Sequence, residues 1–265
     1  MIREKNFLFV CGCPRSGTTV VTQLLNWHPR ISVGIERYGK LLNRDSELFL
    51  PQIFLNDQRF FNIRPSDCFY DSFEYQAYSE WYCSDFNQEK YRQSIYVGDK
   101  NPRFYEHFDV LERQFSADSY KVVFILRDIY SVAKSYNVRA HNPNDKWKAE
   151  NNFKQAIVDW NKGISAVCDR LEQHSASQLI LVNYDDFFVN FDSGKDKLPT
   201  LFDKLELKLE NEVLKGYKLL EEFSQKILAS KEANRKLYQS YELDREYIAA
   251  NALLDKYNLL KKYCI

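Results

Sequence analysis

Two glycines near the start of the chain have the spacing of a phosphate-binding loop. Gly12 and Gly17 stand five residues apart, after a short apolar run and before a stretch with helical periodicity. In such loops the backbone N–H groups and the helix N-terminus surround an oxyanion. The position that usually carries lysine holds Thr18, and the cation lies inside the loop as Arg15. We therefore expect a nucleotide bound without a metal-held triphosphate; the alternative is a plain glycine turn capped by Thr18 or Thr19.

Further polar side chains follow the other short apolar runs of the chain. Carboxyl ends of parallel strands meet at one edge of a sheet, and open α/β sheets bind their ligands there. The sequence thus predicts one crevice with an anion-binding loop, cations and at least one carboxylate. The residues that follow the runs are Glu36, Lys100, Arg127 and Tyr184.

These side chains depend on elements that alternate between strand and helix. Apolar runs without strict alternation are typical of strands covered on both faces. Such runs occupy 7–11, 94–97, 121–126 and 179–182, with a weaker one at 31–33. Helical periodicity is expected over 18–27, 129–141 and 152–174, and the tail from 198 onward is expected to contain helices only. The alternation predicts a three-layer, doubly wound parallel α/β fold of the P-loop nucleotide-binding type.

The composition is that of a globular chain without excess charge. Of 265 residues, 45% are hydrophobic and 28% are charged, and 37 lysine and arginine residues balance 37 acidic ones. This balance gives no global basic field for nucleic acid, and no apolar run approaches the ~20 residues of a membrane span. Six scattered cysteines favour free or buried thiols over a disulfide framework or a zinc site. We expect a cytoplasmic protein, although a trimmed Golgi or secreted protein would look the same.

We expect a single domain over 1–265, with two regions added to the sheet. The region 46–92 is rich in aromatic residues and is expected to be a helical insertion. Its aromatic side chains could line an acceptor pocket or form the core of a helical subdomain, which is the commoner outcome. The region 198–265 is expected to be helical. Its positions 253, 257, 260 and 264 fit either a homodimer seam or burial of the last helix.

The segment Cys13-Pro14-Arg15-Ser16-Gly17-Thr18-Thr19 resembles the 5′-phosphosulfate loop of sulfotransferases that use 3′-phosphoadenosine 5′-phosphosulfate (PAPS). The resemblance covers roughly residues 7–188. It implies that PAPS is the sulfuryl donor, that 3′-phosphoadenosine 5′-phosphate (PAP) is the product, and that no metal is needed. The residues implied in binding the 5′ end of the donor are Pro14, Arg15, Ser16, Gly17, Thr18 and Thr19.

A second family motif is an arginine that ends a strand, followed by a serine eight residues later, and Arg127 and Ser135 fit it. By resemblance these two residues bind the 3′-phosphate of PAPS. Ser135 and Arg139 are four residues apart, so one helix face would carry both. Arg139 also matches a third phosphate-site arginine of the tyrosylprotein-sulfotransferase branch. Tyr184 resembles the nucleotide-contacting tyrosine of that branch, although Asn183 replaces the arginine before it.

The expected general base is a carboxylate rather than a histidine. Cytosolic phenol and steroid sulfotransferases place a histidine two residues after a lysine, but Lys100 is followed by Asn101 and Pro102. Glu36 lies 21 residues after Arg15. The same offset separates the loop arginine from the catalytic glutamate in the tyrosylprotein and mycobacterial trehalose sulfotransferases. The resemblance therefore implies that Glu36 accepts the proton of the acceptor.

Lys100 matches the family lysine that contacts the transferring group. We assign it, together with Arg15, to stabilising charge on the sulfuryl oxygens and on the leaving phosphate. Asp99 is the second candidate for the base. The alternative for Glu36 is a structural ion pair with Arg37 or Arg15.

These expectations combine into in-line transfer of a sulfuryl group from PAPS to a hydroxyl. By family analogy the acceptor is a carbohydrate or a glycolipid, with a tyrosine side chain or a small phenol as the second choice. Two other functions stay open: a P-loop phosphotransferase that uses ATP and Mg²⁺, and a non-catalytic nucleotide-binding protein of the same fold.

Overall fold

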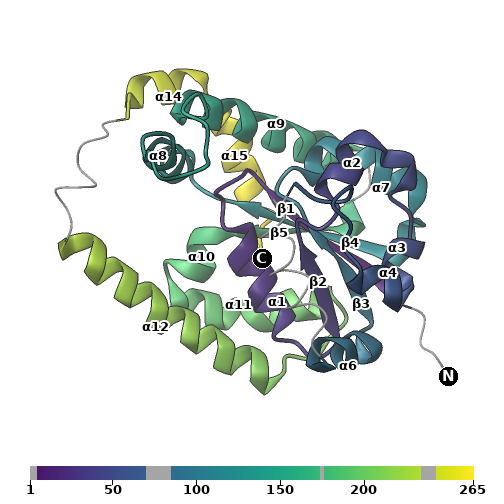
Figure 1. The fold of residues 1–265 in the computed structure, drawn as a ribbon. Coiled ribbons are helices and arrows are strands. Elements are labelled where there is room, and N and C mark those ends of the chain that lie inside the picture. Colours follow the sequence, from purple (N-terminus) through teal and green to yellow (C-terminus); the bar gives the residue numbers. More distant parts are fainter. Residues whose placement is uncertain (1–4, 70–84, 174–175, 234–242) are drawn as a thin grey trace. The chain divides into compact units, whose positions relative to one another are not determined.

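The computed structural model describes residues 5–69, 85–173, 176–233 and 243–265. Its strands form a parallel sheet flanked by helices, in the order β2-β3-β1-β4-β5 (Figure 1). This architecture confirms the predicted α/β fold. The strands are β1 (Asn6–Gly12), β2 (Ile31–Ile35), β3 (Tyr96–Lys100), β4 (Tyr120–Leu126) and β5 (Leu179–Asn183).

Strand β3 differs most from its prediction, which placed it at 94–97. It begins at Tyr96 and continues through Gly98 and Asp99 to Lys100. Glycine and aspartate are poor strand formers, but β3 lies between β1 and β2, and its pairing with both outweighs local propensity. Gly98 pairs with Leu8, and a methyl group on Gly98 would collide with the carbonyl oxygen of Leu8. Lys100 is therefore the last residue of a central strand and does not belong to the loop that follows.

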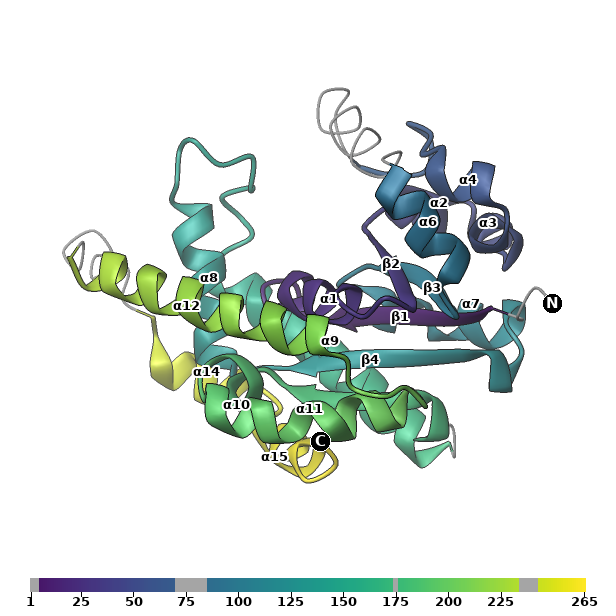
Figure 2. The same cartoon turned by 90° about the horizontal axis from the view of Figure 1, so that it is seen from below.

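By the contacts among their residues, the described parts of the chain form two compact units. The first unit contains residues up to 11 and residues 18–123. Figure 2 shows β1, β2 and β3 side by side in this unit, with helix α1 next to β2. Its helices are α1 (Thr18–Asn26), α2 (Gly39–Arg44), η1 (Ser46–Leu48), α3 (Gln52–Leu55), α4 (Asp57–Phe61), α6 (Asp85–Gln93), η2 (Phe104–His107), α7 (Phe108–Gln114) and η3 (Ala117–Ser119).

Aromatic rings fill the core of the first unit. The ring centre of Phe9 in β1 lies 5.8 Å from that of Phe54 and 5.1 Å from that of Phe115, and both contacts are edge-to-face. In the region 46–92, the described aromatic side chains are buried apart from that of Phe69, which is 66% exposed. In the described part of this region, the aromatic side chains other than Phe69 therefore form part of a core, as the second alternative predicted. Several of its other aromatic residues fall in 70–84, outside the described residues.

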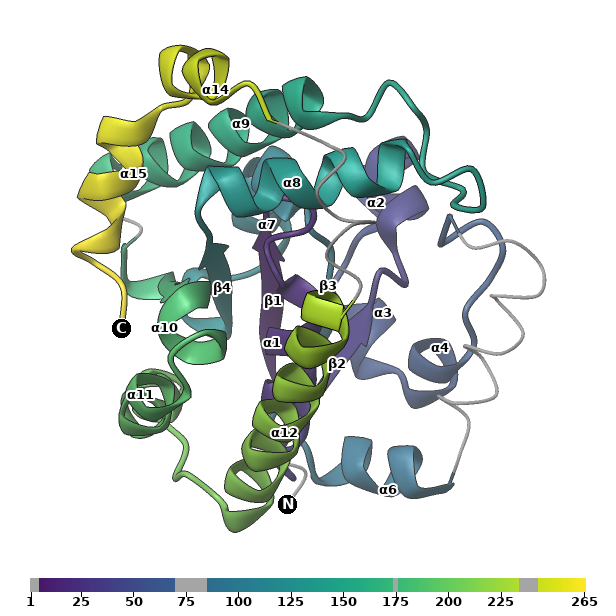
Figure 3. The same ribbon diagram turned by 90° about the vertical axis from the view of Figure 1, so that its left-hand side faces the viewer.

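The second unit contains residues 12–17 and 124–265. Helix α8 packs against α9 and α14 (Figure 1), and α10 packs against α11 (Figure 3). As predicted, the described tail is helical, and Tyr257 and Leu260 of its last helix are buried. The helices are α8 (Ile129–Ala140), α9 (Phe153–Glu172), η4 (Ala176–Gln178), α10 (Tyr184–Phe188), α11 (Phe191–Lys204), α12 (Asn211–Ala233), α14 (Arg245–Asn251) and α15 (Leu254–Lys261).

Two further predictions concern the cysteines and membrane spans. No disulfide joins the five cysteines of the described residues, four of which are buried, and Cys83 lies outside those residues. No helix in the described residues has both the length and the apolar character that crossing a membrane requires.

A buried carboxylate holds the turn that follows β2. Asp99 of β3 accepts hydrogen bonds from the backbone N–H groups of Arg37 and Tyr38, each at 3.2 Å. Asp99 and Arg37 have no exposed surface. Burial raises the pKa of Asp99 from 3.8 to about 7, although the Arg37 guanidinium and the two N–H donors oppose the shift. This environment favours a positioning role for Asp99, which fixes the backbone just after Glu36, over the role of proton acceptor.

The raised pKa of Asp99 makes a prediction about stability. The folded protein holds a proton that the unfolded chain releases above its ordinary pKa of 3.8, so the stabilisation from this group is present at low pH and is lost as the pH rises towards about 7. Asparagine does not titrate. We expect the stability advantage of the wild type over Asp99→Asn to shrink between about pH 4 and pH 7 by on the order of 3 kcal/mol, measured by urea unfolding. The exposed Asp109→Asn is the control, and an advantage of Asp99 that does not change with pH would contradict the prediction.

Candidate functional site

The loop 12–17 has a backbone that its glycines make possible. Gly17 has a φ of +99°, and a methyl group there would collide with the ring of Tyr184. Arg15 also has a positive φ, +70°, which is uncommon for a residue with a side chain. The Ser16 N–H donates to the Cys13 carbonyl at 2.9 Å. The tight turn of the loop therefore comes from three positions with positive φ, at Gly12, Arg15 and Gly17, and from one backbone hydrogen bond.

Two buried polar atoms beside this loop have no hydrogen-bond partner among the described residues. They are the hydroxyl oxygen of Ser16 and the Nε atom of Arg127. Buried polar groups are nearly always hydrogen-bonded, and leaving one without a partner costs free energy. A hydroxyl and a guanidinium N–H can both donate to an oxyanion. The residues present thus fit a bound phosphate or sulfate group.

Arg127, at the end of β4, connects three segments that are far apart in the sequence. Its Nη1 donates to the Arg15 carbonyl oxygen at 3.0 Å, and its guanidinium lies 4.0 Å from the centre of the Tyr184 ring. The indole N–H of Trp160, in α9, donates to the Arg127 carbonyl oxygen at 2.9 Å. The structure therefore brings together Arg15, Arg127 and Tyr184, which the sequence assigned to one nucleotide site.

Helix α8 supplies the remaining predicted phosphate ligands. Asp128 caps the helix by accepting the Ser131 N–H at 2.8 Å. The Nε atom of Arg15 donates to the hydroxyl of Ser135 at 3.1 Å. Arg15, which we assigned to the transferring group, thus contacts a residue of the expected 3′-phosphate set.

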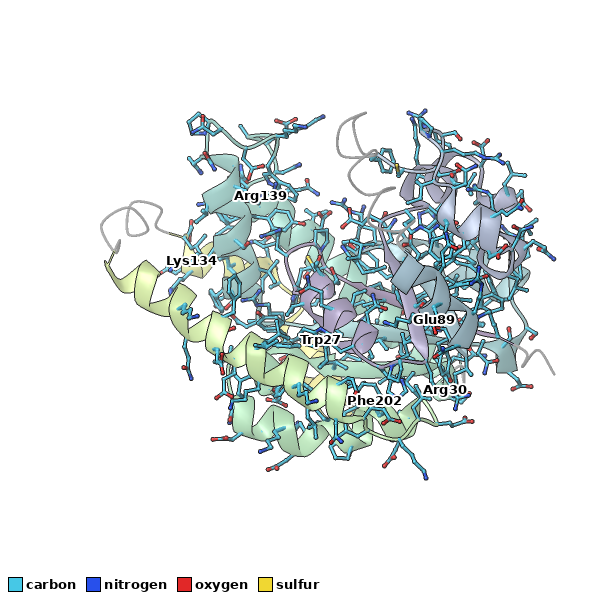
Figure 4. The ribbon with its side chains drawn as sticks, turned by 60° about the horizontal axis from the view of Figure 1, so that its bottom comes forward. Trp27, Arg30, Glu89, Lys134, Arg139 and Phe202 are labelled. Carbon is cyan, nitrogen blue, oxygen red and sulfur yellow. The ribbon has the colours of Figure 1, made fainter. Side chains whose placement is uncertain are left out.

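Positive charge accumulates around this loop. Partial desolvation, with the neighbouring guanidiniums of Arg139 and Arg127, lowers the pKa of Arg15. The like charges of these three arginines repel one another, so a bound anion would lower the electrostatic energy of the arginine group. Figure 4 shows Arg139 near the carboxyl end of α8, with Lys134 further back along the same helix.

Arg139 has a partner that the sequence did not predict. Its Nε and Nη2 atoms donate to the two carboxylate oxygens of Asp145 at 2.7 and 2.6 Å. Hydrogen bonding to Arg139 lowers the pKa of Asp145 to about 2. Asp145 lies in the segment between α8 and α9, six residues after Arg139, and no pattern in that segment distinguishes it from the other acidic residues of the chain.

In the first unit, Glu36 and Lys100 form an ion pair. Lys100 lies in register with Val10 of β1 and Ile35 of β2, at the carboxyl ends of three adjacent strands. Its ammonium group is 2.5 Å from Oε1 of Glu36, and the Glu36 N–H donates to the Lys100 carbonyl oxygen at 2.6 Å. The Lys100 side chain is 1% exposed, whereas that of Glu36 is 46% exposed. A buried ammonium group thus holds a carboxylate that stays about half-exposed to solvent.

The two threonines that end the loop motif differ in exposure. Thr18 is buried in the first turn of α1, and its carbonyl oxygen accepts the Thr22 hydroxyl at 2.8 Å. Thr19 is exposed, and Pro14 is buried in the loop.

Asn183, which replaces the arginine expected before Tyr184, caps helix α10: its side chain accepts a hydrogen bond from the Asp185 N–H.

The described residues hold no group of three or more histidine, cysteine, aspartate or glutamate side chains that is arranged to bind a metal ion.

Comparisons with known proteins identify the family and the fold. The sulfotransferase family model matches residues 8–207. The sulfotransferase domain from the curacin biosynthetic pathway superposes with a TM-score of 0.50 at 19% identity, over 81% of this chain and 78% of that one. The sulfotransferase domain of the Synechococcus PCC 7002 olefin synthase superposes with a TM-score of 0.52 at 18% identity, over 80% of this chain and 77% of that one. At these identities the likeness shows the fold. No curated protein matches the sequence.

The family match covers well over half of the chain, and it includes the loop 12–17, the Glu36–Lys100 pair, and Arg127 with its neighbours on α8. The chain belongs to the sulfotransferase family.

Proposed function

We propose that this protein transfers a sulfuryl group from PAPS to an acceptor hydroxyl. The observation that carries the proposal is the group of arginines 15, 127 and 139 around a loop with unpartnered buried donors. PAPS carries anionic groups at both ends of its ribose, and such a site offers donors for both. The family membership supports the same reaction.

Each end of the donor has its own set of ligands in this proposal. The loop amides, the unpartnered Ser16 hydroxyl and the exposed Thr19 bind the 5′-phosphosulfate end, since loops of this kind present backbone N–H groups to an anion. Arg127, Ser135 and Arg139 bind the 3′-phosphate, and Tyr184 contacts the nucleotide beside Arg127. The hydrogen bond from Arg15 to Ser135 links the two sets.

Glu36 acts as the general base. Its half-exposed carboxylate accepts the acceptor hydroxyl proton as the acceptor oxygen bonds to sulfur and the bond from sulfur to the leaving phosphate oxygen breaks. Lys100 orients this carboxylate through the 2.5 Å contact, and its ammonium group stabilises charge on the sulfuryl oxygens. The left-handed backbone at Glu36, with a φ of +55°, is held by the Lys100 carbonyl and by Asp99. PAPS, when bound, supplies the sulfuryl group and the leaving phosphate.

The proposed acceptor is a carbohydrate or a glycolipid, with a tyrosine side chain or a phenol as the alternative. In the first unit the exposed ring of Phe69 lies against Gly39, where a methyl group would be 3.4 Å from the ring. Gly39 is three residues after Glu36. An exposed aromatic ring near the base can stack on the face of a sugar or of a phenol.

The two other functions are less well supported. A kinase of this fold needs a lysine after the second loop glycine to reach the β- and γ-phosphates, and Thr18 is there instead. A non-catalytic protein has no need for the Glu36–Lys100 pair, whose buried ammonium group costs free energy of desolvation.

The first test of the base is Glu36→Gln, which keeps the shape of the side chain and removes the proton acceptor. We expect sulfate transfer from radiolabelled PAPS into acceptor extracts to fall by about 10²–10⁴-fold, while PAP affinity measured by calorimetry changes by less than about twofold. Glu47→Gln, at an exposed glutamate, is the control. Unchanged turnover in Glu36→Gln would assign the proton to another group.

The 3′-phosphate assignment is tested with Arg127→Ala. We expect PAP to bind about 10- to 100-fold more weakly, because charge-assisted hydrogen bonds to the phosphate are lost. Adenosine 5′-phosphosulfate has no 3′-phosphate, and we expect its affinity to change about tenfold less than that of PAP. Arg113→Ala, at an exposed ion pair, serves as the control. Equal losses for both nucleotides would remove Arg127 from the 3′-phosphate site.

Metal dependence separates the sulfotransferase from the kinase. In buffer with EDTA, we expect PAP to bind the wild-type protein with unchanged affinity, because arginine side chains supply the positive charge. ATP is expected to bind at least about 100-fold more weakly than PAP, with or without Mg²⁺. Calorimetry measures both. Tight, Mg²⁺-dependent binding of ATP would support the phosphotransferase instead.

A further inference from the structure

Asp145 occupies the hydrogen-bonding edge of Arg139. Both carboxylate oxygens accept from that guanidinium, at 2.7 and 2.6 Å, which is the paired geometry that arginine also forms with phosphate. The Asp145 side chain is 17% exposed and that of Arg139 is 31% exposed, so water does not fully screen the pair. The Nε and Nη2 atoms of Arg139, which would donate to a 3′-phosphate, therefore already donate to Asp145.

The segment that carries Asp145 is closed onto Arg139 by a second residue. Trp147 donates its backbone N–H to Oδ1 of Asp145 at 2.9 Å, and its ring centre is 4.6 Å from the Arg139 guanidinium. The same ring makes an edge-to-face contact with Tyr136 of α8 at 5.0 Å. Asp145 and Trp147 are half-buried, while the residues immediately beside each of them are exposed. The segment has no helix or strand between α8 and α9, so these contacts determine its position.

Electrostatics explain why a carboxylate lies there. Asp145 attracts Arg15 as well as Arg139, and it raises the pKa of Arg15 while the other two arginines lower it. With its own pKa lowered to about 2 by Arg139, Asp145 stays ionised at any physiological pH. It therefore neutralises part of the arginine group without a ligand.

We propose that Asp145 is an internal substitute for the 3′-phosphate of the nucleotide. It pairs with Arg139 in the free protein, and the 3′-phosphate displaces it on binding. This inference rests on the proposed function, because it concerns the same nucleotide. A carboxylate that stayed in place would face a phosphate dianion across one guanidinium, and the two anions would repel each other. Most residues of the segment 141–150 are exposed, so moving it away from Arg139 uncovers little apolar surface.

Competition between Asp145 and the 3′-phosphate for Arg139 has a consequence for turnover. PAPS and PAP both carry the 3′-phosphate, so competition from Asp145 weakens the donor and the product alike. Uniformly tighter binding would not raise the rate of the chemical step, and it would slow release of PAP. A nucleotide with a free 3′-hydroxyl leaves the Asp145–Arg139 pair intact. Asp145 therefore tunes affinity for 3′-phosphorylated nucleotides only.

The competing interpretation is that Asp145 positions Arg139 for a phosphate bound at another edge of the guanidinium. The two interpretations predict opposite effects of removing the charge. Displacement predicts that Asp145→Asn binds PAP more tightly, and positioning predicts that it binds PAP more weakly.

The experiment compares PAP with adenosine 5′-monophosphate, which differs from it by the 3′-phosphate alone. Calorimetry is run on the wild type, on Asp145→Asn and on Glu150→Gln, which removes an exposed carboxylate from the same segment. We expect Asp145→Asn to bind PAP about 3- to 10-fold more tightly and to bind the monophosphate within about twofold of the wild type. Glu150→Gln is expected to match the wild type with both nucleotides. Asp145→Ala repeats the test with a second side chain.

A second measurement follows the segment itself. Trp147 is expected to change its fluorescence when PAP displaces Asp145 and not when the monophosphate binds. Trp147→Phe identifies the signal among those of the other tryptophans. Nucleotide-free Asp145→Asn is expected to resemble the PAP-bound wild type.

Each outcome decides between the inference and the function on which it rests. If the wild type does not prefer PAP to the monophosphate, the proposed nucleotide is wrong and the inference falls with it. If the wild type prefers PAP but Asp145→Asn binds it equally or more weakly, the proposed function stands and the substitute role of Asp145 is overturned. An equal gain for both nucleotides in Asp145→Asn also overturns that role.

Discussion

Repulsion among neighbouring guanidinium groups is the constraint on which the proposed phosphate site of this protein depends. Partial burial lowers the pKa of Arg15, and the neighbouring guanidinium groups of Arg139 and Arg127 lower it further. The fold offsets this cost locally: Tyr184 lies under one guanidinium, and Asp145 pairs with another. A ligand with two anionic groups would relieve the same repulsion, so nucleotide binding and the stability of this unit are expected to be linked.

The Glu36–Lys100 pair follows the same physical logic in the first unit. A buried ammonium group is costly without a partner, and Lys100 finds one in a carboxylate that remains half-exposed. The positive φ of Glu36 is maintained by hydrogen bonds from the turn to the Lys100 carbonyl and to Asp99. Asp99 is buried because β3 is a central strand, which explains both its raised pKa and its positioning role.

Much of the site could be read from local patterns. The short apolar runs located β1, β4 and β5 to within one residue at either end, because strands buried on both faces are uniformly apolar. The period of four placed Ser135 and Arg139 on α8, which the structure bears out. The predicted end of β3 at 97 was wrong because pairing with two neighbours extends the strand through Gly98 and Asp99 to Lys100 regardless of their propensity.

The sequence by itself determined the fold class, the family motifs and most of the residue types of the proposed phosphate site, since these depend on spacing along the chain. Tertiary structure alone decided which groups are paired. It placed Trp160 on the Arg127 carbonyl, Asp145 on Arg139 and Asp99 under the turn after Glu36. Such pairings depend on burial and on distances across the fold, and neither leaves a periodic trace in the sequence.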